Sequence, residues 1–373
     1  MKSHIAEYVS PGHPDRLADA IVESIVDLAV GRDSKALVGV ECAVHTDHVF
    51  IDGRIAAGKG KCAVSNEEIE EIARKVYREA GYGGIWIHAP ENLKVIQNVC
   101  LEPLSDDERA IRSLSDDQNV VTGFACSHPE TDYLPPAHFI ANYIGRKVDG
   151  WRRTVSDKFG PDFKVLVHID DNGGRYEWRR LTIGIQHREG VFAAEQHELV
   201  LPVVSGALTE LESRGLAGIS NLPLENFILN GMGDFIVGGP EGDNGLSGKK
   251  LAVDFYGPEI PIGGGAICGK DPHKVDVAGA FRARELARRL LKERGGSAVT
   301  VRLGWTPGDA APAFREAESV DSLGLTHPIP ASALPPEDWF RIDTIVSEMR
   351  LATLVRRERV LAGYFVDSRA FER

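Results

Sequence analysis

The stretch GGGAICGKD, residues 263–271, combines glycines and a lysine in a way that suits phosphate binding. Gly264 to Lys270 has the spacing of a P-loop, but Asp271 stands where that motif needs a serine or threonine for Mg²⁺. The preceding residues YGPEIPI form a poor strand, although a P-loop follows a hydrophobic strand. We therefore reject a P-loop, which leaves a surface turn or another way of holding a polyphosphate.

The next residues add the charges that such a loop would need. Lys270, Lys274 and Asp276 lie within the fourteen residues 263–276, and the last two flank the start of a predicted helix. Lysines neutralise phosphate, and a carboxylate can hold Mg²⁺ against phosphate oxygens. A second glycine-rich stretch, GGPEGDNGLSGKK at 238–250, carries Asp243 beside Lys249 and Lys250. It suits a backbone that wraps an anion, and it equally suits a flexible surface loop.

Two short turns carry further candidates. In GHPDR, 12–16, a helix start places an imidazole and a carboxylate beside free backbone N–H groups. There His13 could stabilise a leaving oxygen and Asp15 could bind a metal, or the acid simply favours the helix dipole. GPDFK, 160–164, places Asp162 and Lys164 at a strand start, which by itself is most often a turn.

The bulk properties limit the class of protein. The chain has 373 residues, 43% of them hydrophobic, and a net charge of −12, which argues against a nucleic-acid surface but allows a locally basic pocket. Five scattered cysteines, with no CxxC pair, predict neither a disulfide framework nor a zinc site and favour the cytoplasm. We expect no signal peptide and no membrane span. The grouped lysines, glycines and carboxylates together fit a pocket for a nucleoside triphosphate.

Helices and antiparallel strands recur along the chain about three times, which predicts an α+β protein of two or three similar units. The segment 103–118, charged and weakly periodic, is predicted to be a mobile loop. Helices are predicted near 14–30, 66–82, 138–160, 192–216, 271–295 and 341–358. Strands are predicted as a hairpin at 36–57 turning at Asp52–Gly53, a pair at 163–187 around DNGG, and single strands at 251–257 and 298–307.

Read together, the motifs resemble the methionine adenosyltransferases (S-adenosylmethionine synthases). VSPGHPDRLADAI, DDQNVVTGFA, GPDFK, FIVGGPEGDNGLSGKK and GGGAICGKDPHKVD occur in the family's order, from about residue 5 to about residue 280. The last fifty residues do not match. In this family the aspartate at position 271 is normal, so the opening loop resembles a separate tripolyphosphate loop. The resemblance implies three similar α+β units with antiparallel or mixed sheets and helices on one face. We place the units at 1–110, 111–235 and 236–373, with strands exchanged between them.

The resemblance implies that methionine sulfur attacks C5′ of ATP and displaces tripolyphosphate, which is then hydrolysed. It implies Mg²⁺ and K⁺ as cofactors, and a homodimer or dimer of dimers with shared active sites. No catalytic nucleophile is needed, since alignment and charge stabilisation carry such a displacement. The implied catalytic residues are His13, Lys164, Lys249 and Lys270; the implied metal ligands are Asp15 and Asp276 for Mg²⁺ and Glu41 for K⁺; the implied ATP and amino acid contacts are Glu7, Asp117, Asp162, Phe235, Asp243, Lys250 and Lys274.

Several positions depart from the family pattern. Arg54 replaces a glutamate associated with the amino group of methionine, and a cation there would repel an ammonium. Lys249 replaces an arginine at phosphate, with loss of its fork geometry. Arg16 and Asp234 are further exchanges, and the gating loop lacks a Gln-Gly pair. Arg54 could pair with an anionic group of a different acceptor, or lie in solvent away from the pocket.

Three functions remain open at this point. The first is S-adenosylmethionine synthesis. The second is transfer to another nucleophile, or triphosphate cleavage without methionine. The third is a non-catalytic nucleotide-binding protein, which the retention of both Asp15 and Asp276 disfavours.

Overall fold

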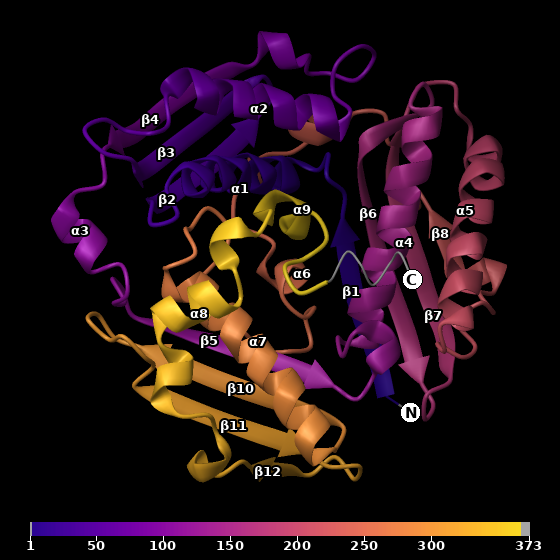
Figure 1. The fold of residues 1–373 in the computed structure, drawn as a ribbon. Helices are drawn as coiled ribbons and strands as arrows, with labels where there is room; N and C mark the ends of the chain where they lie inside the picture. The colour runs from indigo at the N-terminus through magenta and orange to yellow at the C-terminus, as the bar shows by residue number, and fades with distance from the viewer. Residues whose placement is uncertain (1, 367–373) are drawn as a thin grey trace.

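The computed structural model describes residues 2–366, whose strands form three four-stranded sheets (Figure 1). The first sheet has the order β1 (Lys2–Val9), β6 (Phe159–Asp171), β7 (Tyr176–His187), β8 (Phe227–Leu229). The second has the order β12 (Thr326–Pro328), β11 (Phe314–Val320), β10 (Ala298–Trp305), β5 (Asn119–Cys126). The third has the order β4 (Lys94–Glu102), β3 (His48–Ala56), β2 (Leu37–His45), β9 (Gly245–Leu246).

Strands distant in sequence meet within each sheet. β1 pairs antiparallel with β6, so that Val9 lies opposite Lys164, and β5 pairs antiparallel with β10. β9, from the glycine-rich stretch 238–250, adds to the edge of β2. Two pairings, β3 with β4 and β7 with β8, are parallel, so two of the sheets are mixed. The predicted α+β class with antiparallel or mixed sheets is confirmed.

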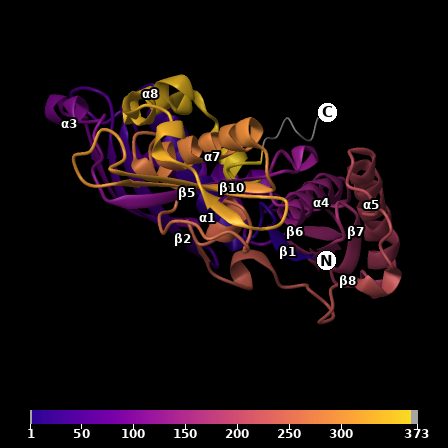
Figure 2. The same ribbon diagram turned by 90° about the horizontal axis from the view of Figure 1, so that it is seen from below.

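Each sheet carries helices against one face. The helices are α1 (Pro14–Arg32), α2 (Asn66–Ala80), α3 (Asp106–Ala110), α4 (Pro136–Arg152), α5 (Ala193–Ser213), α6 (Leu251–Asp254), α7 (Val275–Arg294), α8 (Ile342–Glu348) and α9 (Arg356–Val360). α4 packs on β1 and β6 and against α5, α7 packs on β5 and β10, and α1 packs on β2 beside α2. Figure 1 shows α1, α4 and α7 facing the middle of the molecule, and Figure 2 shows α3 and α5 at opposite ends.

The central helix α1 is buried along most of its length. Leu17, Ile21 and Ile25 are fully buried, as their helical spacing predicts. Its polar residues are also buried, because partners from distant segments satisfy them: Arg16 binds Asp254, and Glu23 accepts two bonds from Arg356 of α9. The C-terminal segment therefore packs directly on the helix that carries the first motif.

Most predicted elements are confirmed, and local chemistry explains their ends. α2 begins with a capping box in which Ser65 and Glu68 bond each other's backbone, and it ends at Gly81 in the left-handed conformation. The strand pair around DNGG corresponds to β6 and β7. The long helix predicted after the polyphosphate motif is α7.

Four local predictions are wrong. The β2–β3 hairpin turns at Thr46–Asp47, and Gly53 lies inside β3, where a Cβ would stand 2.1 Å from the carbonyl oxygen of Gly39. LAVDFYG begins with α6, because its valine and phenylalanine pack into the core between elements. Segment 103–118 contains α3, capped by Ser105. The single helix predicted at 341–358 is two short helices, α8 and α9.

The three-unit division at 1–110, 111–235 and 236–373 stays a prediction. Within residues 2–366, no helix combines the length and apolar character that crossing a membrane requires.

Candidate active site

The first motif lies at the start of α1. His13 is the N-cap residue and its Nδ1 accepts the backbone N–H of Asp15 at 3.2 Å. Because Nδ1 is an acceptor, the neutral ring carries its proton on Nε2. Burial lowers the pKa of His13 to about 3, and the nearby cation of Lys164 adds to this. The imidazole is therefore a neutral hydrogen-bond donor at physiological pH.

The lysines of the stretch 238–250 gather on Asp15. Lys250 Nζ lies 2.9 Å from Oδ2 of this carboxylate and Lys249 Nζ lies 3.6 Å from Oδ1. The backbone N–H of Leu246 also donates to Oδ1, at 3.0 Å. Asp15 is 1% exposed, whereas the side chain of Lys249 is 43% exposed. A buried carboxylate thus holds two ammonium groups, one of which is largely open to solvent.

GPDFK brings its charges to the same place. Asp162 is buried and accepts the backbone N–H of Gly239 at 2.8 Å, which ties β6 to the glycine-rich stretch. Burial raises the pKa of Asp162 to about 6, the carboxylates of Asp243 and Asp15 add to this, and Lys164 opposes it. These mutual effects show that the predicted residues of three separate motifs lie within one electrostatic environment.

The second loop holds a separate ion pair. Lys270 Nζ lies 2.6 Å from Oδ1 of Asp276, in the first turn of α7. Gly265 passes so close that a Cβ there would stand 1.9 Å from that same oxygen. A side chain at this position would push the carboxylate aside, so glycine lets the loop backbone form a cradle around it.

The surroundings of Asp271 explain why an aspartate stands where a P-loop has a serine or threonine. It is fully buried, it forms an ion pair with Arg112, and it accepts the backbone N–H groups of Val38 and His273 at 2.9 Å each. A carboxylate with these partners fastens the loop to β2 and to segment 103–118. The aspartate is an anchor of the loop, and the hydroxyl of a P-loop has no counterpart here.

Both glycine-rich loops rest on α1. Asp19 accepts the backbone N–H of Gly248 at 2.8 Å, and its Oδ1 lies 3.3 Å from Cys268 Sγ. A Cβ on Gly248 would lie 2.9 Å from Cβ of Ala266, so the two loops touch. The Asp15 cluster and the Asp276 cluster consequently lie along one contiguous wall, although 260 residues of sequence separate the two acids.

Arg54 lies on the same side of the third sheet as Lys270. It pairs across the strands with Gly39, which in turn bridges to Lys270. Its guanidinium donates to Glu102 at 2.9 Å and to Glu108 at 2.7 Å. The hydrogen bonds that Arg54 donates to Glu108 and Glu102 raise its pKa. Two carboxylates surround the cation, so this corner of the site carries a net negative charge.

Segment 103–118 is fastened to the site at four points. Besides Glu108, Arg109 binds Asp33, Arg112 binds Asp271, and Asp116 binds Lys274 at 2.6 Å. Sequence reasoning missed Glu102, Glu108, Arg112 and Asp116 as partners of the site. The only sequence signal for them was the number of acidic and basic residues in and beside this segment. Long-range pairing determines which of these charges meet, so the sequence did not identify the partners.

The remaining predicted residues lie at the edges of these clusters. Glu7 on β1 pairs with Leu166, two residues beyond Lys164, and therefore lies on the same side of the sheet as Lys164. It also lines a pocket of about 320 Å³ together with Ala252, Val253, Gly257 and Pro258. Asp117 is exposed, and its neighbour Asp116 contacts Lys274 instead. Phe235 is half-buried; its carbonyl oxygen accepts the backbone N–H of His187, and its own N–H donates to Nε2 of the His187 ring. Glu41 is exposed on β2 opposite Asp52.

The candidate metal ligands stand as single carboxylates. Across residues 2–366 there is no group of three or more histidine, cysteine or acidic side chains arranged to hold an ion. Mg²⁺ is commonly bound by one or two carboxylates together with substrate phosphates, so Asp15 and the cradled Asp276 fit such a shared site.

Comparisons with known proteins identify the family of the chain. Sequence models of the S-adenosylmethionine synthetase N-terminal and C-terminal domains match residues 2–100 and 237–372. The second match extends nearly to the end of the chain, so the expectation that the last fifty residues do not match the family is wrong. The glycine-rich motifs that carry the resemblance end before residue 280, and the later part of the chain has no such motif.

Two curated relatives illustrate the similarity. An S-adenosylmethionine synthase of Maricaulis maris is 33% identical over 316 residues, covering 82% of this chain and 78% of the relative. One of Zymomonas mobilis is 33% identical over 321 residues, with the same coverage. An unusual S-adenosylmethionine synthetase of Campylobacter jejuni has the same fold, with a TM-score of 0.82, 22% identity, and coverage of 100% of this chain and 97% of that one. The chain belongs to the S-adenosylmethionine synthase family of transferases.

Proposed function

We propose that this enzyme forms S-adenosylmethionine from ATP and methionine and releases tripolyphosphate, which it then hydrolyses. The observation that carries the proposal is the shared wall of α1, along which Asp15 with Lys249 and Lys250 adjoins the loop of Lys270 and Asp276. Ammonium groups spaced along a wall can neutralise successive phosphates of one chain.

The displacement needs stabilisation of the leaving oxygen more than proton transfer. A sulfur lone pair forms the S–C5′ bond, the C5′–O5′ bond breaks, and its electron pair leaves with tripolyphosphate. Neutral His13, whose Nδ1 is held by the N–H of Asp15, presents Nε2–H as a donor for that oxygen. Lys164, whose charge acts on this imidazole, would neutralise the adjacent phosphate.

We propose that Asp15 and Asp276 bind Mg²⁺ together with phosphate oxygens and that Glu41 binds K⁺. The divalent ion would neutralise charge on the polyphosphate. In this arrangement Lys250 and Lys270, which now pair with the two aspartates, turn to phosphate. Lys274 would exchange Asp116 for phosphate in the same way.

The base and ribose would lie toward β1 and the glycine-rich stretch. We propose that Phe235 stacks on adenine and that Glu7, Asp117, Asp162 and Asp243 contact the nucleoside or the amino acid. The support is that Asp162 accepts the backbone N–H of Gly239, which brings β6 against the glycine-rich stretch that contains Asp243.

The surroundings of Arg54 favour an acceptor that carries an ammonium group. Arg54 by itself would repel methionine, but Glu102 and Glu108 together leave one negative charge in excess. An anionic acceptor would have to displace one of these two carboxylates. The contacts therefore support methionine over an acceptor with a carboxylate or phosphate in this corner.

We propose that the protein forms a homodimer through the open face of the third sheet. The assembly would be either this dimer alone or a dimer of such dimers. Phe50, Ile96 and Leu246 lie there in one cross-strand row and are 44–48% exposed. Exposed apolar rows of this kind mark interaction surfaces. Arg54 and Lys270 share that face, so a second copy would adjoin the site. A cytoplasmic location fits five free thiols.

One incubation separates the candidate functions. The enzyme with ATP, Mg²⁺ and K⁺ is analysed by mass spectrometry with methionine, with 4-(methylthio)butanoate, which lacks the amino group, and with neither. Methionine-dependent adenosyl sulfonium, little product from the analogue, and its loss in His13→Ala are expected. Methionine-independent release of phosphate or tripolyphosphate would instead support triphosphate cleavage, and no turnover would refute both.

A further inference from the structure

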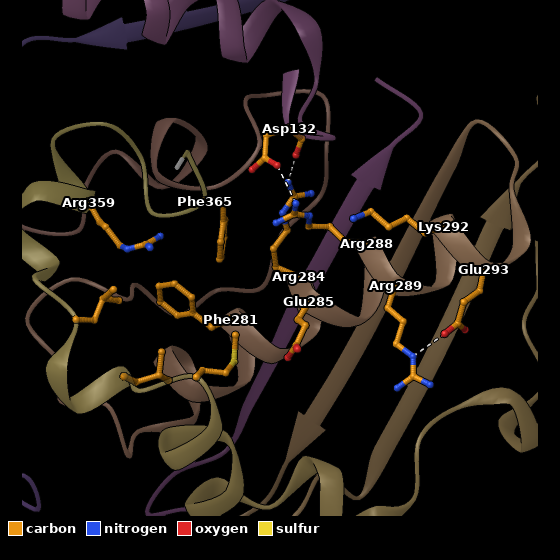
Figure 3. A pocket seen from close by; sticks show the side chains of 13 residues that line it. Asp132, Phe281, Arg284, Glu285, Arg288, Arg289, Lys292, Glu293, Arg359 and Phe365 are labelled. Atoms are coloured by element: carbon orange, nitrogen blue, oxygen red, sulfur yellow. Dashed lines mark hydrogen bonds and ion pairs between the residues drawn. The ribbon is translucent and has the colours of Figure 1, made fainter. Parts of the chain in front are cut away.

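A second pocket lies far along α7 from its catalytic first turn. It has a volume of about 590 Å³ and opens between the outer side of α7 and the segment 349–365 that includes α9. Figure 3 shows Phe281 and Phe365 at one end and a line of cations along α7 beside them. Small-molecule sites commonly measure roughly 300–1,000 Å³. The pocket is therefore large enough for a ligand with one or two rings.

The floor of this pocket is apolar. Phe281 and Phe365 meet edge to face with ring centroids 5.4 Å apart, and Phe365 also stacks on Tyr256 at 5.1 Å. Met349, Leu351 and Leu354 from the C-terminal segment complete it. Aromatic and aliphatic walls of this kind bind the apolar body of a ligand.

The wall above that floor is basic. Its lining includes five cations against three carboxylates, on a chain whose net charge is −12; the cations are Arg284, Arg288, Arg289, Lys292 and Arg359. Each carboxylate already has a cation: Asp132 binds Arg288 at 2.8 Å, Glu293 binds Arg289 at 2.8 Å, and Glu285 binds Arg282, which lies outside the lining, at 2.7 Å. Arg284 and Lys292 therefore have no carboxylate partner among the described residues, 2–366.

Arg284 shows how this wall holds its charge. Its side chain is buried, and its donors go to the carbonyl oxygens of Phe124, Tyr133 and Asp132. These carbonyl partners fix the guanidinium in place without neutralising it. Lys292 lies 5.0 Å above the ring of Tyr133, a contact that also leaves its charge in place. A fixed cation next to an apolar floor is a recognition element for an organic anion.

We propose that this pocket binds an amphipathic organic anion, whose apolar or aromatic body rests on Phe281 and Phe365 and whose carboxylate, sulfonate or phosphate faces Arg284, Arg288 and Lys292. The site is separate from the polyphosphate loops, because none of its lining residues belongs to them. It does not depend on the reaction that the loops perform.

The test uses 8-anilinonaphthalene-1-sulfonate as the anionic probe and N-phenyl-1-naphthylamine as its neutral counterpart, with fluorescence titration of the full chain. One saturable site for the sulfonate is expected, and excess tripolyphosphate should not displace the probe. Lys292→Glu should weaken sulfonate binding by about tenfold, since two unit charges change near the anion, and should leave the neutral probe unaffected.

Arg294→Glu is the matched control, because it makes the same charge change on an exposed residue two positions further along α7 and outside the pocket. It should change sulfonate binding by less than about twofold. Leu354→Gln should weaken both probes. Absence of saturable binding, equal effects of the two charge reversals, or displacement by tripolyphosphate would each overturn the proposal. Circular dichroism of every variant checks that it folds.

Discussion

Replacing Gly265 by alanine tests whether the loop backbone sets the position of the Asp276 carboxylate. The new Cβ would stand 1.9 Å from Asp276 Oδ1 and 2.7 Å from Asn119 Nδ2. Ordinary contact requires about 3.5 Å, so the carboxylate must retreat by about 1.5 Å. Gly264→Ala is an adjacent control, because no atom lies within 4 Å of its added Cβ.

The expected effect falls on rate far more than on stability. A catalytic group misplaced by about 1 Å can cost about 100-fold in rate, or about 2.7 kcal/mol of activation free energy. The Lys270–Asp276 pair that is disturbed is partly exposed, so its loss changes the free energy of unfolding by about 1 kcal/mol or less.

The assay is steady-state formation of the adenosyl product from ATP and methionine, together with urea unfolding of each variant. We expect Gly265→Ala to lose about 100-fold in kcat/KM while Gly264→Ala stays within about threefold of the parent. Equal rates for the two variants would refute the idea that this carboxylate acts from the position the glycine gives it. A rate restored by raising Mg²⁺ would support a role of Asp276 at the metal.

Three further results are expected. Asp271→Ala leaves Arg112 buried without its carboxylate and should lower the free energy of unfolding by about 3–5 kcal/mol, measured by urea titration; an unchanged midpoint would show that the loop is held otherwise. His13 should stay neutral by NMR titration down to about pH 4. Because its folded pKa of about 3 lies below the unfolded value, its contribution to stability is lost as the pH falls from about 6.5 toward 3. An NMR titration midpoint of the His13 ring near pH 6.5 would contradict this. A double-mutant cycle of Arg54→Ala and Glu108→Ala should give a coupling of about 0.5–1 kcal/mol, since both side chains are partly exposed, whereas zero coupling would mean that α3 is not fastened there.

The sequence by itself determined which charged and flexible residues the candidate site has. Glycines at 263–265, lysines at 270 and 274 and an aspartate at 276, grouped with the lysines and carboxylates of the other motifs, predict a pocket for a nucleoside triphosphate. Local rules also predicted the helix that starts within GHPDR and the one that ends at Gly81, because capping and periodicity act over a few residues. Such signals depend on neighbours along the chain and are therefore readable without a fold.

Tertiary structure decided which charges meet. Arg54, expected to repel an ammonium group or to lie in solvent, is enclosed by Glu102 and Glu108 because β3 runs parallel to β4, which leads into α3. Asp271 became an anchor only because segment 103–118 brings Arg112 to it. Pairings across tens or hundreds of residues depend on strand order and register, and short spacings do not encode these. The sequence contains the charged side chains, and the packing of distant segments around α1 determines which of them form ion pairs.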